Sequence, residues 1–211
     1  MSFPQQSPIN IHLPVPAQDV LRLDLNWRET HGTIGNCGGH GVKIEFHDAK
    51  NVTVLDGSEY FLREMHFHHP GEHLINGVPF AAELHMVHQS ASDDTRLVLG
   101  LFLDVCHMDE SVAGEEDMAD FIQCLESTRR NIPTNPNDWL RPEPHITYRY
   151  EGSLTTEPYT ENVTWIVFKK PKTIGKHLYR AIFQDTCPHA REVQPLYRRF
   201  VLMQHWSSCE S

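Results

Sequence analysis

Two short runs of the sequence, at residues 64–69 and 83–85, carry the residue types of a metal centre. Successive side chains of a β-strand alternate between its two faces, so Glu64, His66 and His68 would share one face. The same rule puts Glu83 beside His85 on the second run. Three imidazoles with carboxylates behind them are the donor set of an open zinc site, of the catalytic rather than the structural kind.

The sequence between the two runs favours bringing them together. Pro-Gly at 70–71 and Asn-Gly at 76–77 are turn signals, so the two runs can lie side by side as strands. The alternative is that these histidines are ordinary surface or core residues, because the chain has fifteen histidines and i, i+2 pairs can arise by chance. The third histidine, with an acidic neighbour two residues before it, favours the metal site, but the residues alone leave both interpretations open.

Length and charge limit the classes of protein to consider. A chain of 211 residues can form one domain with a substantial core, so we expect a single domain over residues 1–211. The net charge is −10, and no basic cluster is longer than two consecutive residues. These features argue against nucleic acid and against an anionic membrane surface as partners. No apolar run approaches the ~20 residues that a membrane-spanning helix needs.

The compartment is predicted from the first residues and from the cysteines. The sequence begins without a positively charged region followed by an apolar one, so no signal peptide is visible and we expect a cytoplasmic protein. An extracellular or periplasmic location is the alternative if the natural N-terminus is longer. Five scattered cysteines without CxxC spacing indicate reduced thiols rather than disulfides.

Alternation of apolar and polar residues predicts strands through most of the chain. Residues 98–103 and 162–168 are almost continuously apolar, which is typical of central strands covered on both faces. Apolar residues at i, i+3, i+4 and i+7 predict two helices, over residues 115–131 and about 173–184. We therefore expect a mainly β (α+β) domain whose large sheet carries a few helices at its edges.

Several further motifs give the sequence a resemblance to a known family. In chain order they are QSPINI at 6–11, HFH at 66–68, GEH at 71–73, AAELHMVH at 81–88, GSLTT at 152–156, VTWIV at 163–167 and QPL at 194–196. These motifs resemble the α-class carbonic anhydrases over roughly residues 5–200, and the short link at 70–77 resembles the microbial-type branch. The resemblance implies a mostly antiparallel twisted sheet with zinc at the base of a conical cleft.

The activity implied by the resemblance is the zinc-dependent, reversible hydration of carbon dioxide to bicarbonate and a proton. His66, His68 and His85 would bind Zn²⁺, and neutral imidazoles leave the metal's charge to lower the pKa of a bound water to about 7, the value known for such zinc sites. The resulting hydroxide attacks CO₂. Glu64 and Glu83 would lie behind the ligands; position 64 is usually glutamine in the family, and an ionised glutamate there would raise the pKa of the bound water.

Other roles also follow from the resemblance. Thr155 would accept a hydrogen bond from the zinc hydroxide and donate its own proton to Glu72, which as an ionised carboxylate can only accept. His40, in a glycine-rich loop, matches the histidine that carries protons to solvent, with an idle surface residue as the alternative. Four residues match the apolar CO₂ pocket and are equally expected as core: Val87, Val98, Leu154 and Trp165.

Two alternative functions share much of this sequence. A non-catalytic carbonic-anhydrase-like binding module typically lacks one or more zinc histidines, whereas all three are retained here, which favours the enzyme. A zinc-dependent esterase side activity would use the same residues and is not distinguished. The ligands implied are CO₂ or bicarbonate and sulfonamide and anion inhibitors, with a monomer or homodimer as the assembly. Family members usually carry an N-terminal segment before the QSP motif, so either this N-terminus is naturally short or the natural protein has a longer one.

Overall fold

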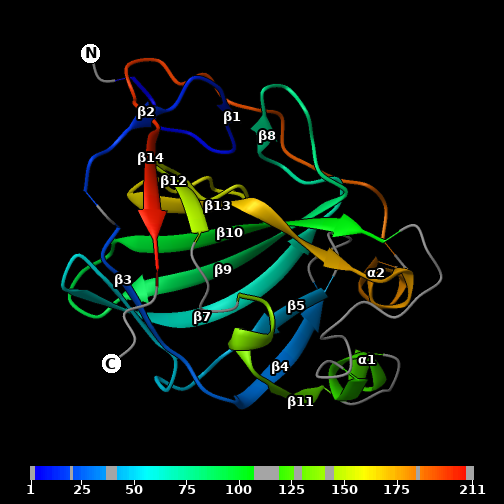
Figure 1. Cartoon of the computed structure of the whole chain (residues 1–211). Helices are drawn as coiled ribbons and strands as arrows, with labels where there is room; N and C mark the ends of the chain where they lie inside the picture. Colours follow the sequence, from blue (N-terminus) through cyan, green and yellow to red (C-terminus); the bar gives the residue numbers. More distant parts are fainter. Residues whose placement is uncertain are drawn as a thin grey trace.

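A large twisted sheet runs through the described part of the chain (Figure 1). The computed structural model describes residues 3–19, 21–36, 42–106, 119–125, 130–140, 145–183 and 186–207. Its elements are β1 Asn10–Ile11, β2 Val15–Pro16, β3 Leu23–Asn26, β4 Thr30–Asn36, β5 Val42–Glu45, β6 Val52–Leu55, β7 Ser58–His68, β8 Leu74–Ile75, β9 Ala82–Ser90, β10 Arg96–Val105, α1 Ala119–Leu125, β11 Asn131–Thr134, η2 Pro136–Asp138, β12 His145–Gly152, β13 Val163–Ile174, α2 Lys176–Phe183 and β14 Leu202–Trp206.

The strand order across the described sheet is β11-β4-β5-β7-β9-β10-β13-β12-β14-β2, with β6 pairing to both β3 and β7. Every neighbouring pair from β11 to β10 is antiparallel, whereas β10 with β13 and β14 with β2 are parallel. Strands β1 and β8 form a separate parallel pair. The expected fold class, a mainly β domain with a large, mostly antiparallel sheet, is therefore confirmed.

Alternating residues of the central strands bury apolar side chains on both faces of the sheet. On β10, Leu97, Leu99 and Leu101 belong to one buried cluster, and Val98 and Phe102 belong to the other. On β7, which pairs with the other side of β9, residues 65 and 67 belong to the first cluster. Residues 66 and 68 must therefore face the side of the sheet on which Val98 and Phe102 lie, which positions the candidate site.

The two predicted helices are present, but both are shorter than the periodicity suggested. Helix α1 lies inside the expected range 115–131, of which residues 115–118 and 126–129 are outside the described part of the chain. The predicted end was wrong, because Asn131 begins β11 and pairs with Thr33 of β4. Likewise Thr173 and Ile174 complete β13 before α2 begins. In both places pairing with an existing strand outweighs the local helical pattern.

Both helices lie at the same end of the sheet (Figure 1). On α2, Leu178, Ala181 and Ile182 are buried against the first cluster, as the periodicity predicted. Neither described helix is both long and apolar enough to cross a membrane.

Candidate metal centre and pocket

Three buried histidine rings meet where β7 and β9 pair. The antiparallel register puts His66 directly opposite His85, and His68 is two residues further along the same face of β7. The ring centroids are 4.9 Å apart for His66 and His68, 5.2 Å for His66 and His85, and 4.6 Å for His68 and His85. One nitrogen of each ring lies within 4.8 Å of the others. The arrangement is that of three neutral donors converging on one point.

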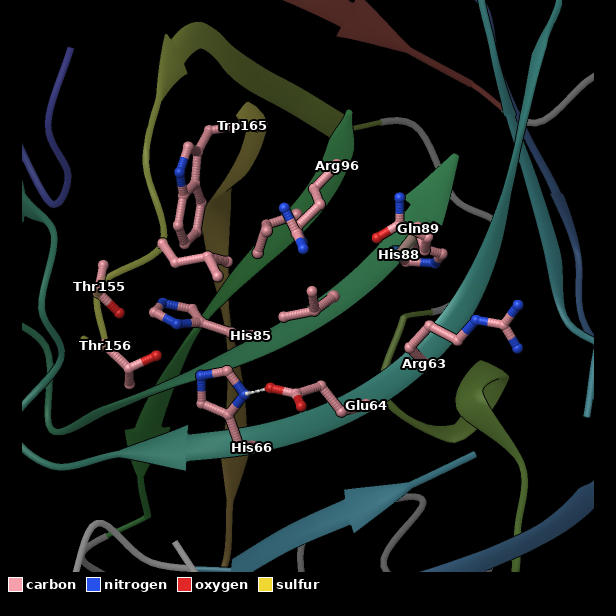
Figure 2. Close-up of a pocket in the computed structure, with 13 residues that line it drawn as sticks. Arg63, Glu64, His66, His85, His88, Gln89, Arg96, Thr155, Thr156 and Trp165 are labelled. Carbon is pink, nitrogen blue, oxygen red and sulfur yellow. Dashed lines mark ion pairs between the residues drawn. The ribbon is translucent and has the colours of Figure 1, made fainter. Parts of the chain in front are cut away.

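Carboxylates behind two of the rings determine which nitrogens are left for a metal. Glu83 Oε1 lies 3.0 Å from His85 Nε2, so His85 Nδ1 is left for the cluster. Glu64 Oε1 lies 3.0 Å from His66 Nδ1 as an ion-pair contact, without the alignment of a hydrogen bond (Figure 2). His66 Nε2 is buried and makes no hydrogen bond with the described residues. A buried nitrogen without such a partner fits a metal ligand, and the donor set suits zinc.

A second close group, His73, Glu83 and His85, is better explained as a hydrogen-bonded network. Both nitrogens of His73 are engaged, with Nδ1 at 2.7 Å from Glu83 Oε1 and Nε2 at 2.6 Å from the Tyr150 hydroxyl. The Tyr150 hydroxyl in turn donates to Ser7 Oγ at 2.8 Å. Because His73 has no nitrogen to offer, this group supports the carboxylate rather than binding a metal.

Glu83 is held in its ionised form by this network. Burial alone would raise the pKa of its carboxyl, but the facing His73 and His85 rings lower that pKa well below its usual value. Its Oε2 also accepts backbone N–H bonds from Glu72 at 2.9 Å and His73 at 2.8 Å. The sequence predicted Glu83 but not the supporting His73, Tyr150 and Ser7. For His73, its position next to Glu72 in the GEH motif was a signal in the sequence; Tyr150 and Ser7 had no such signal.

Glu72 and Thr155, expected to orient the nucleophile, are both buried beside the cluster. Glu72 Oε1 accepts the backbone N–H of Arg191 at 2.9 Å and lies 3.6 Å from His68 Nδ1. Glu72 Oε2 makes no hydrogen bond with the described residues and is 3.9 Å from His85 Nδ1. The expected bond from Thr155 to Glu72 is not formed within the described part of the chain, so Glu72 retains a free acceptor.

A cavity of about 250 Å³ opens over His66 and His85 (Figure 2). The four residues expected for the CO₂ pocket, Val87, Val98, Leu154 and Trp165, all line it. Three of them also belong to the second buried cluster, and Leu154 packs against it. The pocket interpretation and the core interpretation of these residues are therefore compatible.

The same cavity is also lined by polar and charged residues that the sequence analysis did not assign to it. Arg63, Gln89 and Arg96 contribute to its wall together with Glu64 (Figure 2). Burial would raise the pKa of Glu64, but His66 and Lys43 lower it to about 2. Lys43 Nζ lies 2.9 Å from Glu64 Oε2, so this carboxylate is ionised and paired.

His69 and His88, the other histidines near the motif, are not part of the cluster, as expected. His69 faces the opposite side of the sheet, where its Nε2 is 2.9 Å from Thr186 Oγ1 and its ring contacts Phe183. His88 bonds to Thr53 Oγ1 and to the carbonyl of Met86. The proposed proton carrier, His40, lies outside the described residues.

Comparison with known proteins decides the family. The sequence profile of the eukaryotic-type carbonic anhydrases matches residues 2–206. The chain belongs to this family. The alpha carbonic anhydrase 7 of Arabidopsis thaliana is 34% identical over 184 residues, which are 85% of this chain and 66% of that protein. Dioscorin DB3L of Dioscorea polystachya is 31% identical over 209 residues, covering 93% and 74% respectively. The chain thus spans about two thirds to three quarters of the length of these relatives.

Solved carbonic anhydrase structures share the fold. The α-carbonic anhydrase of Thermovibrio ammonificans in complex with sulfanilamide has a TM-score of 0.77 and 30% identity, over 94% of this chain and 86% of that one. Dioscorin complexed with ascorbate has a TM-score of 0.79 and 29% identity, over 98% and 87%. The α-carbonic anhydrase family is zinc-dependent, which agrees with the donor set of the three histidines. Because the relatives include proteins of Arabidopsis thaliana, Homo sapiens and Thermovibrio ammonificans, the microbial-type branch stays a prediction.

Proposed function

We propose that this member of the carbonic anhydrase family catalyses the reversible hydration of CO₂ to bicarbonate and a proton. The observation that carries the proposal is the convergence of three buried imidazoles, two of which, His66 and His85, line a cavity with a partly apolar wall. His66, His68 and His85 would hold zinc. When bound, zinc supplies a Lewis acid and a water acidic enough to serve as nucleophile at neutral pH.

The surrounding residues determine which atoms of the site carry a proton and which accept a hydrogen bond. Ionised Glu83 keeps a proton on His85 Nε2, so that Nδ1 carries the lone pair. Glu72 Oε2 is a buried acceptor without a hydrogen bond in the described structure. A hydrogen bond from the Thr155 hydroxyl would satisfy it, and the Thr155 oxygen would then accept a hydrogen bond from the nucleophile and turn its lone pair toward CO₂.

The apolar wall suits an uncharged substrate. Val87, Val98 and Trp165 are buried and would leave an apolar space beside the histidines. CO₂ has no net charge that a charged side chain could bind. These residues would therefore contribute an apolar place for CO₂ beside the histidines. The proton produced has to leave for solvent, and His40 remains the proposed carrier on sequence grounds.

Measuring three quantities on one preparation tests the proposal: zinc content, CO₂ hydration with and without sulfanilamide, and ester hydrolysis. We expect one zinc per chain and hydration that sulfanilamide inhibits. His85→Ala should lose both zinc and activity, whereas the control His69→Gln should keep both. Zinc without hydration would instead indicate a binding module, the alternative suggested by similarity to dioscorin complexed with ascorbate. Ester hydrolysis without hydration would indicate an esterase.

A further inference from the structure

Two arginines line the cavity that opens over the histidine cluster. Arg63 comes from β7, Arg96 begins β10, and Gln89 of β9 lies on the same wall. Figure 2 shows the Arg96 side chain reaching into the space between Trp165 and Gln89, on the His85 side of the sheet. Hydration of an uncharged gas requires neither guanidinium, so their presence needs another explanation.

The sheet register explains why these side chains share a wall with the histidines. Gly100 of β10 pairs with His85, Val98 pairs with Val87, and Arg96 pairs with Gln89. Arg96 therefore points to the same face as His85, four residues or about 13 Å further along the strand. The register between β7 and β9 shifts between residues 62 and 64, which inserts Arg63 as an extra residue. Arg63 lines the edge of the cavity, and its side chain extends away from the histidines (Figure 2).

No carboxylate within the described residues neutralises either arginine. The Arg96 guanidinium makes no hydrogen bond or ion pair with them, and Arg63 Nη1 donates only to the backbone carbonyl of Asp48 at 3.1 Å. Glu64, the carboxylate on this wall, shares Lys43 with Glu45, at 2.9 and 3.0 Å from Lys43 Nζ respectively. With two arginines and one glutamate, the described cavity wall carries a net positive charge although the whole chain has a net charge of −10. A concave, partly apolar wall concentrates this field.

We propose that Arg96, assisted by Arg63, forms an anion-recognition site for a small organic carboxylate whose other end lies at the histidine cluster. A guanidinium binds a carboxylate through two parallel N–H bonds, and this geometry distinguishes it from a simple positive charge. The cavity of about 250 Å³ accommodates a ligand the size of a substituted benzene ring. The two-ended binding mode rests on the metal centre proposed above.

Two matched sulfonamides test this site. Sulfanilamide carries a neutral amine at the end opposite its sulfonamide, and 4-sulfamoylbenzoate carries a carboxylate there. By isothermal titration calorimetry, we expect the zinc-loaded protein to bind 4-sulfamoylbenzoate roughly tenfold more tightly, the value of one charge-assisted hydrogen bond. Arg96→Gln should abolish this preference and change sulfanilamide affinity less than about twofold. Arg96→Lys should recover only part of it, because lysine cannot make the paired bonds.

Lys169→Gln is the matched control, because it removes one positive charge from an exposed position outside the cavity. It should leave the preference intact. Equal binding of both sulfonamides by the unmodified protein, or an equal loss in Arg96→Gln and Lys169→Gln, would overturn the anion site while leaving the metal centre standing.

If neither sulfonamide binds, the metal centre is wrong and a separate measurement decides the arginine site. Terephthalate has a carboxylate at each end, so one remains for the arginine whichever end enters first. We expect it to shift the NMR signal of Arg96 Nε–H in the protein as isolated, with the signal assigned from Arg96→Lys. An unmoved Arg96 signal at saturating terephthalate would refute the proposal.

Discussion

His85 and His88 lie three residues apart on β9 and differ in the hydrogen-bond partners of their ring nitrogens. These partners determine whether a nitrogen is left for the cluster. His85 Nε2 faces ionised Glu83, which leaves Nδ1 for the cluster. His88 Nδ1 donates to the Met86 carbonyl at 3.0 Å, and its Nε2 lies 2.9 Å from Thr53 Oγ1. Because Thr53 Oγ1 already accepts the indole N–H of Trp27 at 2.9 Å, its own proton goes to His88. His88 is therefore a neutral core residue.

The buried His88 predicts a loss of stability in mild acid. Burial lowers its pKa from 6.5 to about 4, so the unfolded chain binds a proton between these pH values and the folded chain does not. Stability is therefore complete above pH 6.5 and falls as the pH drops toward 4, by up to about 3 kcal/mol. Urea unfolding at pH 7.0 and 4.5 measures the fall, which should be smaller in His88→Gln. The same pH dependence in both proteins would contradict this assignment.

Thr155 provides a test of orientation that is separate from metal binding. Thr155→Val keeps the shape but removes the hydroxyl, so the hydration rate should fall by about 100-fold, the scale of one oriented hydrogen bond in a transition state. Zinc content should be unchanged. Thr156→Val, in the same pocket wall, is the control and should reduce the rate much less. Similar losses in both variants would show that Thr155 has no special role.

The histidine cluster could be anticipated from the sequence because a strand has a strict two-residue period. His66, His68 and His85 needed only that rule and one turn to meet. Arg63 could not be found in this way, since the register shift beside it reverses the face that the period assigns. Arg96 lies on the expected face, but nothing in its local sequence indicates that a cavity reaches so far along β10.

At the scale of elements, the end of β12 is fitted closely to its neighbours. Gly152 pairs with Val163 of β13, and a Cβ at this position would collide with Ser7 Oγ and lie 2.9 Å from Tyr150 Cε2. This Cβ would also lie 3.1 Å from Cδ1 of Trp165, which lines the cavity. The absence of a side chain at Gly152 is what allows the N-terminal segment to reach the Glu83 network.

Gly152→Ala should therefore destabilise the protein by about 1–3 kcal/mol, the usual cost of overpacking a core. Gly35→Ala on β4 is the matched control, because its Cβ would meet only Glu45 Cδ, at 3.9 Å. We expect a change within about 0.5 kcal/mol there. Urea unfolding of both variants gives the two values, and equal values would mean that the contacts around Gly152 relax without cost.

The strand and helix assignments show the limits of local patterns. The run at 98–103 was identified correctly as central because continuous apolar sequence requires cover on both faces, and β10 has it. The helix expected to reach Asn131 stopped earlier because β4 offered a partner strand. Which strand is available for pairing depends on residues about 100 positions away, and no local window contains that information.

At the scale of the whole molecule, metal binding should be coupled to folding. The three histidines come from two central strands, and an unfolded chain has no preformed site. Free zinc at a thousandfold excess over its dissociation constant should stabilise the protein by about 4 kcal/mol. Urea unfolding before and after removal of zinc with a chelator measures the difference. His85→Ala should show none, and an equal loss in that variant would mean that the chelator acts elsewhere.

Arg191 joins distant parts of the chain around Glu72. Its backbone N–H bonds to Glu72, and its guanidinium bonds to the Ser7 carbonyl at 2.6 Å and to Gln6 Oε1 at 2.9 Å. All three histidines are encoded before residue 90, whereas this partner of Glu72 comes 119 residues after it. A ribosome therefore delivers the metal-binding strands long before it delivers the residue that fixes the acceptor. With the proposed roles, a nascent chain would gain affinity for the ion first and reactivity last.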